Sequence, residues 1–436
     1  MRNLLRSIGR FREDQRGSVA IIMGVLIIPL VGILGIGFEV SNWYMVTRSM
    51  QNAADAATLA AATNGGANYD VEAKAVAAQY GFVDGTNTVS VAATNTAACP
   101  DGSGNFCYRV TITGSVPLLV SQVVGFKGDA AANGTMKLSS LAVATAGKQD
   151  VCLLALASSG VAQGIRTNGA PTGSMNGCDS LSNTGAQCNG HNLGLGISFA
   201  VGSNNGCGAR QVSSPPLADP YAYLASNIPA VSSPCDGSIP SHFLPSGSLS
   251  LSAGPTVVKG DQILTGDTVI NTPLGQPAVL IIENGQLDLA KHNLTSSNGS
   301  AVTIVFSGTN GTCNHTLANN GHGTGGAIDI AAPGPNSGPW SGVAIYQAPN
   351  LTSGVDVSAA GNSPTWNISG LIYMPHATIT LKGAIDKSNV GKSCVVLVAD
   401  NFQISGTGGI LKSDVGQCAQ AGLKPPAAKL GSQLVL

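Results

Sequence analysis

Carboxylates able to act as an acid and a base are scarce in the long part of the sequence that follows residue 149. This part has one glutamate, Glu283, and single aspartates without an Asp-x-Asp or Asp-Asp pair. Glycoside hydrolysis needs two carboxylates about 5–10 Å apart, and Glu283 with Asp288 is the pair that could meet across a corner between strands. Solvated residues at strand ends explain both positions more simply, so we predict that the protein is not an enzyme.

The densest group of potential metal ligands lies in the segment CNHTLANNGHG, which holds Cys313, His315 and His322. Cysteine and histidine at such spacing can bind zinc. A disulfide at Cys313 and two loop histidines explain the same residues. We therefore expect no metal and no cofactor, with zinc as the alternative.

Four aromatic residues offer a second kind of site, because aromatic rings can stack on sugars. They are Trp340, Tyr346, Trp366 and Tyr373. If they line one outer face, the protein is a carbohydrate-binding or carbohydrate-cleaving β protein displayed from the envelope; packing in a core explains them equally well. Nucleic acid is not an expected partner, since 10% of the residues are charged, the net charge is −1, and Lys and Arg cluster at the N-terminus alone.

All ten cysteines follow residue 98. An even number in this position indicates disulfides formed in an oxidising compartment. Cys99 and Cys107 flank the turn-rich segment CPDGSGNFC and could close a hairpin. The other pairings stay open.

The element that must position everything else is an apolar span from Gly17 to Phe38, followed at once by Glu39. Its 22 uncharged residues extend roughly 33 Å as a helix, enough for a bilayer core, and exceed the apolar region of a signal peptide. Strong helix formers continue to Thr63, so we predict one helix over residues 18–63 in which Pro29 causes a kink at most. Trp43 and Tyr44 fall where an interfacial aromatic belt belongs.

Charge sets the expected orientation of this anchor. Five arginines precede the span, namely Arg2, Arg6, Arg10, Arg12 and Arg16. The positive-inside rule then places the N-terminus in the cytoplasm. We predict a single-pass membrane protein whose later domains lie in the periplasm or at the cell surface.

Small side chains follow on the same helix, between Met50 and Ala62. They are Ala53, Ala54, Ala57, Ala60 and Ala61. Such residues let another helix approach closely, and a plain spacer helix explains them as well.

The remaining chain divides by pattern. Residues 65–149 predict a small α+β module, with a helix from Asn68 capped by Asp70 and Gly81 and with alternating strands after it. Residues 150–418 contain short apolar runs such as AVLIIE and AVTIVF at intervals of about 15 to 30 residues, which favours a right-handed parallel β-helix. An antiparallel sandwich is the alternative, and residues 419–436 form a tail.

The segment from Phe11 to Ala62 resembles the N-terminal part of TadG-like proteins, in the TadE/TadG group of Flp (tight-adherence) pilus assembly. The resemblance rests on Arg16 and Gly17 before the span, Glu39 after it, and MQNAADAATLAAA. Runs such as GLIYMPHATITLKG and CVVLVADNFQISGTGGI are similar to the C-terminal half of such proteins. The resemblance implies a fold of mixed class and a protein that works with pilus-assembly or secretion-machine proteins at the bacterial inner membrane. It implies a role related to adhesion and no enzymatic activity.

One departure bears on processing. Pilin-type processing cuts the chain after a glycine and leaves a glutamate at the fifth position of the mature chain. A cut after Gly17 would place Ile22 at that position. An acidic residue inside an apolar span is kept for function, and here it is missing. We therefore favour an uncut anchor over a polymerising pilin, while cleavage after Gly17 stays open.

Overall fold

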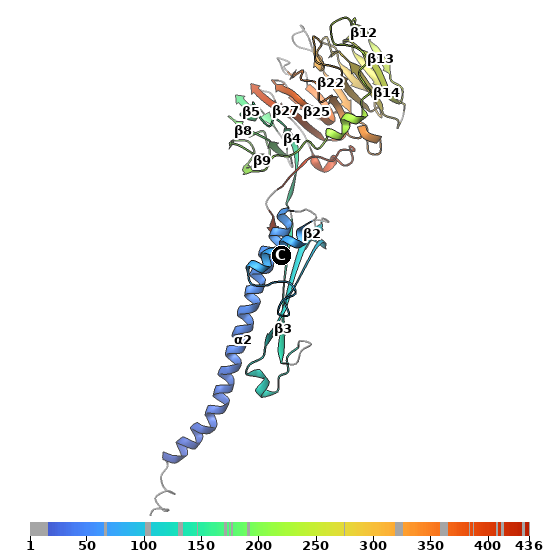
Figure 1. Ribbon diagram of the computed structural model, residues 1–436. Coiled ribbons are helices and arrows are strands. Elements are labelled where there is room, and N and C mark those ends of the chain that lie inside the picture. Colours follow the sequence, from blue (N-terminus) through green and yellow to red (C-terminus); the bar gives the residue numbers. More distant parts are fainter. Residues whose placement is uncertain are drawn as a thin grey trace, which may run out of the picture. The chain divides into compact units, whose positions relative to one another are not determined.

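A computed structural model describes residues 16–64, 68–100, 106–129, 134–145, 147–169, 172–173, 175, 178–189, 192–273, 275–318, 326–357, 365–382, 384–386, 388–406, 409–410, 414–429 and 432–435 (Figure 1). The chain forms two compact units. Unit 1 comprises residues 1–147 and 430–436, and unit 2 comprises residues 148–429. The apolar helix and the α+β region are thus one unit, and the last residues return to it, whereas the sequence pattern separated the helix, the module and the tail.

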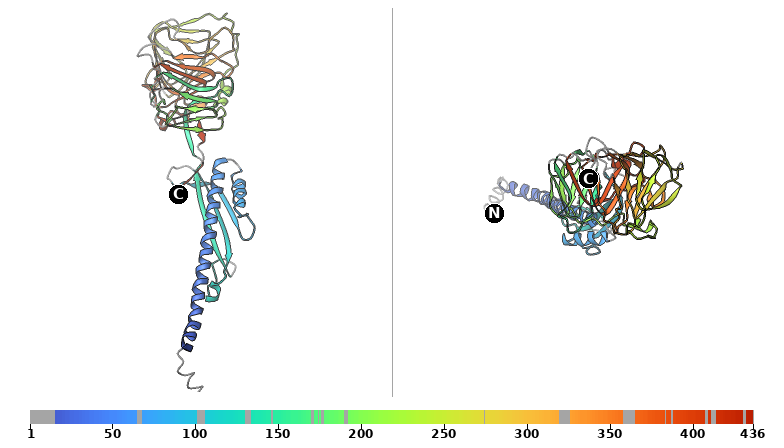
Figure 2. Two further views of the ribbon diagram at one scale, coloured as in Figure 1. Left: turned by 90° about the vertical axis from the view of Figure 1, so that its left-hand side faces the viewer. Right: turned by 90° about the horizontal axis from the view of Figure 1, so that it is seen from above.

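Unit 1 pairs one long helix with an antiparallel sheet. Its elements are α2 (Arg16–Asn64), α3 (Tyr69–Gln79), β1 (Ser90–Ala98), β2 (Phe106–Pro117), the 3₁₀ helix η1 (Ser121–Val124), β3 (Thr135–Thr145) and β30 (Gln433–Leu434). The strand order is β1-β2-β3-β30, with antiparallel pairing throughout these strands. Because β30 pairs with β3, the C-terminal end lies beside this sheet (Figure 2).

The core of unit 1 forms where the second half of α2 packs on α3 and the sheet. Alanines of α2 meet Ala73 and Ala77 of α3 and apolar residues of the strands, including Val110 and Ile112. The expected cap at Asp70 is wrong by two residues: the N-cap position of α3 is Asn68, whose side chain makes no capping hydrogen bond, and Asp70 lies in the first turn, where a carboxylate favourably faces the helix dipole. The helix ends at Gln79 with Tyr80 as its C-cap residue, and Gly81 follows at φ +90°.

Unit 2 is almost entirely β structure. Its strands are β4 (Lys148–Ala155), β5 (Gln163–Gly169), β6 (Thr172–Gly173), β7 (Asp179–Ser182), β8 (Gly185–Cys188), β9 (Ile197–Ala200), β10 (Asn204–Asn205), β11 (Arg210–Ser213), β12 (His242–Leu244), β13 (Gly247–Ser250), β14 (Gly254–Lys259), β15 (Gln262–Leu264), β16 (Thr268–Asn271), β17 (Ala278–Glu283), β18 (Leu287–Asp288), β19 (Leu294–Ser296), β20 (Val302–Ser307), β21 (Leu317–Ala318), β22 (Ile328–Ala331), β23 (Val343–Gln347), β24 (Val355–Val357), β25 (Thr365–Leu381), β26 (Ala384–Asp386), β27 (Val395–Gly406), β28 (Gly409–Ile410) and β29 (Ala427–Lys429). Short 3₁₀ helices lie between them: η2 (Ala222–Asn227), η3 (Gly338–Trp340) and η4 (Val415–Gln417).

Most strands of unit 2 pair in parallel with a strand that lies two or three strands further along the chain. In one series β14 pairs with β17 and β17 with β20, so that Gly254 faces Ala278 and Ala278 faces Val302. Parallel series also run β13-β16-β19-β22 and β12-β15-β18-β21. Within the described residues only β29 with β4 is antiparallel. The antiparallel sandwich is therefore wrong, and unit 2 is a mainly-β region of parallel sheets.

The order of the strands in space differs from their order in the chain. The chain enters unit 2 at β4 and proceeds through β7 and β9 to β11, then runs through residues 214–241 to β12 and returns through β25 to β27. β27 then pairs with both β4 and β5. The first and last long strands of unit 2 are therefore neighbours in the middle of the stack, as Figure 1 shows for β4, β27 and β25.

Candidate functional site

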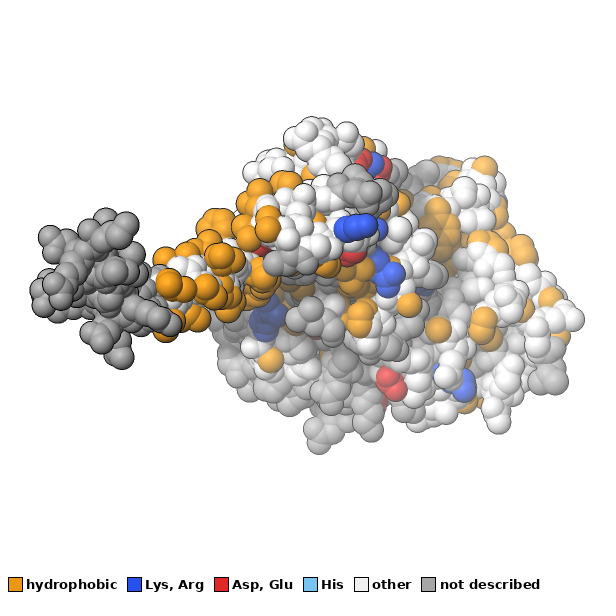
Figure 3. Space-filling view, turned by 90° about the horizontal axis from the view of Figure 1, so that it is seen from below, with side chains coloured by type: hydrophobic (Ala, Val, Ile, Leu, Met, Phe, Trp, Pro, Cys, Tyr) orange, Lys and Arg blue, Asp and Glu red, His pale blue; other side chains and the backbone are white. Residues whose placement is uncertain are grey.

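The first part of α2 presents apolar side chains on every side. From Ile21 to Phe38 the large apolar residues are between 36% and 74% exposed. Figure 3 shows this stretch as a nearly continuous hydrophobic surface. Among the described residues this is the one helix long and apolar enough to cross a membrane.

The residues predicted for the anchor occupy different places along this helix. Gly17 lies in the first turn of α2, and α2 continues without interruption through Pro29. Phe38 is 68% exposed, whereas the next residue, Glu39, is 1% exposed. Arg2, Arg6, Arg10 and Arg12 lie outside the described residues.

The carboxylate of Glu39 is bound by the segment that opens η1. Its Oε1 accepts hydrogen bonds from the N–H of Leu119 (2.7 Å) and the hydroxyl of Ser121 (3.1 Å), and its Oε2 accepts from the N–H groups of Val120 (3.1 Å) and Ser121 (2.7 Å). Hydrogen bonds to an ionised carboxylate are about twice as strong as neutral ones. Glu39 therefore joins α2 to a loop 80 residues later in the chain.

The same loop packs closely on the helix one turn earlier. A Cβ placed on Gly35 would lie 2.6 Å from Cγ1 of Val120. A glycine at this position therefore permits the approach that brings the backbone of residues 119–121 within reach of Glu39. Neither the partners of Glu39 nor this contact was predicted; the uncharged run PLLVSQVVGF from Pro117 to Phe126 is the sequence signal that could have drawn attention to it.

The alanines predicted for helix packing turn toward the interior of unit 1. Ala53, Ala54, Ala57 and Ala61 are fully buried against α3 and the sheet. Ala60 is half-buried. The helix that approaches these small side chains closely is thus α3 of the same chain.

Cysteine chemistry in this chain is disulfide chemistry. Cys99 and Cys107 form the predicted bond across the hairpin of β1 and β2. The other four bonds, which the sequence left open, are Cys152–Cys178, Cys188–Cys207, Cys235–Cys313 and Cys394–Cys418. All ten cysteines are paired, as an oxidising compartment favours.

The zinc alternative at Cys313 fails on this pairing. Cys313 is bonded to Cys235 and so offers no thiolate. His315 is fully buried, and burial lowers the pKa of its imidazole; His322 lies outside the described residues. Within the residues that the structure describes, no group of three potential ligands is arranged to hold a metal ion.

The single glutamate of unit 2 is held by hydrogen bonds and a cation. Glu283 accepts from the hydroxyl groups of Ser232 (3.0 Å) and Ser233 and from the N–H of Ser232 (3.2 Å), and Lys259 lies 3.7 Å away. Burial acts to raise the pKa of Glu283, but these hydrogen bonds and Lys259 together lower it. A carboxylate so held stays ionised, which is unsuited to the acid role in glycoside hydrolysis.

Asp288, the expected partner of Glu283, has a local structural contact. Its Oδ1 accepts a hydrogen bond from the N–H of Ala290 at 3.0 Å, two residues later. Both carboxylates are buried, with Glu283 4% and Asp288 6% exposed. The expectation that both residues are solvated is therefore wrong: both side chains are buried, and each accepts hydrogen bonds from the protein.

The proposed aromatic platform for sugars is also wrong. Trp340 and Trp366 are each 7% exposed, and Tyr346 and Tyr373 are fully buried. The rings of Tyr346 and Tyr373 stack on each other with centroids 5.0 Å apart, and Trp340 meets Tyr346 edge-on at 5.2 Å. These residues form core packing and present no face to a ligand.

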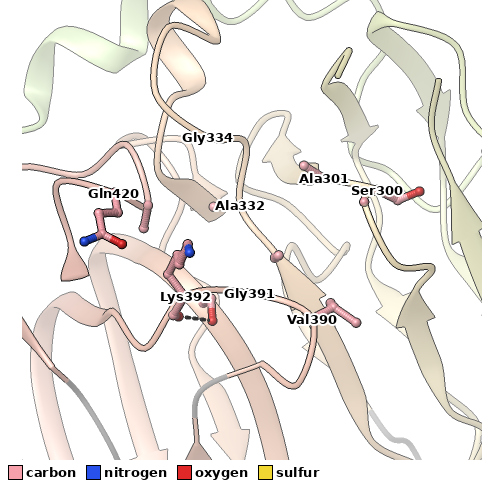
Figure 4. A pocket seen from close by; sticks show the side chains of 12 residues that line it. Ser300, Ala301, Ala332, Gly334, Val390, Gly391, Lys392 and Gln420 are labelled. Atoms are coloured by element: carbon pink, nitrogen blue, oxygen red, sulfur yellow. Dashed lines mark hydrogen bonds between the residues drawn. The ribbon is translucent and has the colours of Figure 1, made fainter. Parts of the chain in front are cut away.

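A pocket of about 310 Å³ in unit 2 also lacks catalytic groups (Figure 4). Small residues and backbone form most of its wall, and Lys392 and Gln420 project beside it. No carboxylate or imidazole is among its described lining residues. The pocket therefore offers no acid and base pair.

Comparison with protein families found one match, and it falls on the long helix of unit 1. A family described as putative Flp pilus-assembly TadE/G-like matches residues 17–64, which spans α2 from its apolar stretch through Glu39 and the buried alanines. Comparisons with curated proteins and with solved structures found no match. Residues 17–64 are therefore similar to the TadE/G-like family of Flp pilus assembly.

Proposed function

We propose that this protein is a membrane-anchored, non-enzymatic component of Flp pilus assembly. The observation that carries the proposal is the coincidence of the TadE/G-like match with a helix whose first half exposes apolar side chains on all sides. A bilayer removes such a surface from water, at about 25 cal/mol for each Å² of apolar area. Its partners are then other pilus-assembly or secretion-machine proteins at the bacterial inner membrane.

The orientation follows from charge and redox chemistry. In this proposal the basic N-terminal residues remain in the cytoplasm, and the part of unit 1 that follows Phe38 and the whole of unit 2 lie on the periplasmic side. Five disulfides support this placement, because such bonds persist in the periplasm and are rare in the cytosol.

Unit 2 in this proposal is a right-handed parallel β-helix that serves as a projecting interaction body. Three parallel series of strands and a repeat of 24 residues between Gly254, Ala278 and Val302 support this architecture. Parallel crossovers are right-handed in nearly all sheets. The satisfied carboxylate of Glu283 and the buried aromatic residues support a role without catalysis.

Processing is tested on protein from the native host. Intact mass and N-terminal sequence are compared between the inner-membrane fraction and material sheared from the cell surface. We expect an uncut chain confined to membranes. Gly17→Leu is the control, because it removes a cut after Gly17: a sheared form starting at Ser18 that disappears in this variant would instead place the protein in the fibre.

The anchor is tested at Gly32, where an added Cβ meets no atom within 4 Å. Gly32→Arg places a charge inside the span at a cost of about 2.5–3.5 kcal/mol, whereas Gly32→Ala does not. In a host lacking the chromosomal copy, we expect Gly32→Ala to restore membrane retention and piliation and Gly32→Arg to lose both. Equal piliation by the two variants contradicts the proposal.

A further inference from the structure

A loop of unit 1 exposes large apolar side chains to an unusual degree. In the segment from Pro117 to Phe126, called here the apolar loop, Val123 is 85%, Leu119 57% and Phe126 42% exposed. The apolar loop contains no charged residue, and Lys127 follows it directly. Contiguous exposed apolar residues mark an interaction surface.

The position of the apolar loop along α2 is set by two contacts. Val120 packs against Gly35, which lies inside the apolar span, and the N–H groups of residues 119–121 bind Glu39, which ends it. Trp43 contacts Phe126, with ring centroids 6.2 Å apart. The apolar loop therefore lies beside the last turn of the span and continues its apolar surface sideways.

Most backbone N–H groups of the apolar loop already have hydrogen-bond partners, as an environment without water requires. Unpaired N–H groups are costly in a bilayer. Here the N–H groups of seven residues have partners within unit 1: Leu118, Leu119, Val120, Ser121, Val123, Gly125 and Phe126. The amide of Gln122 also donates to the carbonyl of Leu118 at 2.9 Å. The large side chains that the loop exposes are then Leu119, Val123 and Phe126, and the side chain of Gln122 is exposed beside them.

We propose that the apolar loop is a second membrane contact, inserted into the outer boundary of the bilayer beside the end of the α2 span. The proposal rests on the proposed function, in which α2 crosses the membrane. Leu119, Val123 and Phe126 enter the acyl region near the headgroups, and Lys127 meets anionic headgroups. Glu39 positions the loop for this contact through its four hydrogen bonds.

This second contact fixes the orientation of unit 1 about the axis of the α2 span. A single helix with apolar side chains on all sides has no preferred face toward the lipid. A loop inserted on one side of the helix orients the sheet of unit 1, since its removal from the bilayer would expose three large side chains to water.

The test uses the full chain reconstituted in vesicles of phosphatidylethanolamine and phosphatidylglycerol. Because all native cysteines form disulfides, single introduced cysteines accept an environment-sensitive fluorophore. The sites are Val123→Cys in the apolar loop, Val31→Cys in the span and Val71→Cys on α3. Val71 is a matched control: it is 61% exposed, and α3 packs on the alanines that begin at Ala53, roughly 22 Å of helix beyond Phe38.

Quenching by spin-labelled lipids separates the outcomes. We expect a shallow quencher to act on Val123→Cys roughly twofold more than on Val71→Cys, and a deep quencher to act on Val31→Cys. Quenching at Val31 with none at Val123 overturns the membrane contact and leaves the anchor intact. Absence of quenching at Val31 overturns the proposed anchor itself.

A second variant tests the role of Glu39 in placing the apolar loop. Glu39→Gln should reduce shallow quenching in the Val123→Cys chain and leave deep quenching in the Val31→Cys chain unchanged. Glu72→Gln, on α3, is the control. Unchanged quenching at Val123 in both variants would remove Glu39 from the proposal.

Discussion

At the scale of single residues, the most informative side chain is Glu39, because its position in the sequence and its role in the structure are both defined. Its carboxylate receives three backbone N–H groups and one hydroxyl. The acidic residue of this TadE/G-like segment thus acts within the chain, by holding a loop. A glutamine offers one acceptor oxygen and places an amide against the remaining donors.

Glu39→Gln should loosen the apolar loop locally. Leaving buried donors unsatisfied costs about 1–3 kcal/mol, which corresponds to roughly 5- to 150-fold faster amide exchange at Leu119, Val120 and Ser121. Hydrogen exchange measured by mass spectrometry checks this, with Glu72→Gln as the control. Equal protection of these amides in the variant and the parent chain would contradict the structural role.

A buried aspartate gives a prediction of pH dependence. Burial raises the pKa of Asp179, the hydrogen bond from Ile197 partly lowers it, and Asp150 raises it further. The folded-state pKa lies above the unfolded value of about 3.9, so folding favours the protonated form. The contribution of Asp179 to stability is most favourable below the unfolded pKa and is lost as pH rises through the folded pKa.

Asp179→Asn should therefore stabilise unit 2 at neutral pH, and the gain should shrink in acid. In the parent chain the N–H of Ile197 donates to Oδ1 of Asp179 at 2.6 Å, and an asparagine keeps an oxygen that can accept this hydrogen bond. Fluorescence of Trp340 and Trp366 during urea unfolding, in a Trp43→Phe background, reports the free energy. Asp236→Asn should not stabilise, because hydrogen bonds from Ser238 lower the pKa of Asp236.

At the scale of elements, α2 has two different halves. The first half is exposed and apolar, and the second presents buried alanines to α3 and the sheet. Both halves belong to one continuous helix, and they differ in the size of the side chains that they present. Alanine allows close approach, whereas a larger side chain overpacks the interface.

Ala57→Leu should destabilise unit 1 by about 1–3 kcal/mol, because Ala57 is fully buried. Ala60→Leu, one turn away and half-buried, should cost less. Trp43 fluorescence in a background of Trp340→Phe and Trp366→Phe follows the unfolding of unit 1. Equal losses in the two variants would show that the packing does not distinguish these positions.

At the scale of the whole molecule, strand pairs and disulfides connect residues that are far apart in the sequence. Unit 2 begins and ends on neighbouring strands, and the disulfide between Cys235 and Cys313 ties the segment before β12 to the chain 78 residues later. Cys99 and Cys107, in unit 1, are separated by 8 residues. Loop-closure entropy makes the longer link the stronger constraint on the unfolded chain.

Replacing Cys235 and Cys313 by serine should lower the free energy of unfolding of unit 2 by roughly 4 kcal/mol, against roughly 2 kcal/mol in unit 1 for Cys99 and Cys107. The two tryptophan backgrounds described above measure each unit in the full chain. A smaller effect for the 78-residue link would contradict the entropic account.

The sequence by itself determined the features that depend on local periodicity and composition. The uninterrupted helix through Pro29, the short disulfide across CPDGSGNFC, and the mainly-β character of unit 2 follow from helix propensity, turn residues and spaced apolar runs. These signals act over a few residues, so they can be read without knowing the packing.

Tertiary structure alone decided which distant residues meet. It brought Glu39 to residues 119–121, placed β27 beside β4, and buried Trp340 and Tyr373 in the core rather than on a face. The physical reason is that apolar strands of similar composition can pair in many orders, and an aromatic residue suits a core or a binding face equally well. The choice is made by whichever arrangement satisfies the buried polar groups and fills the interior of the whole unit.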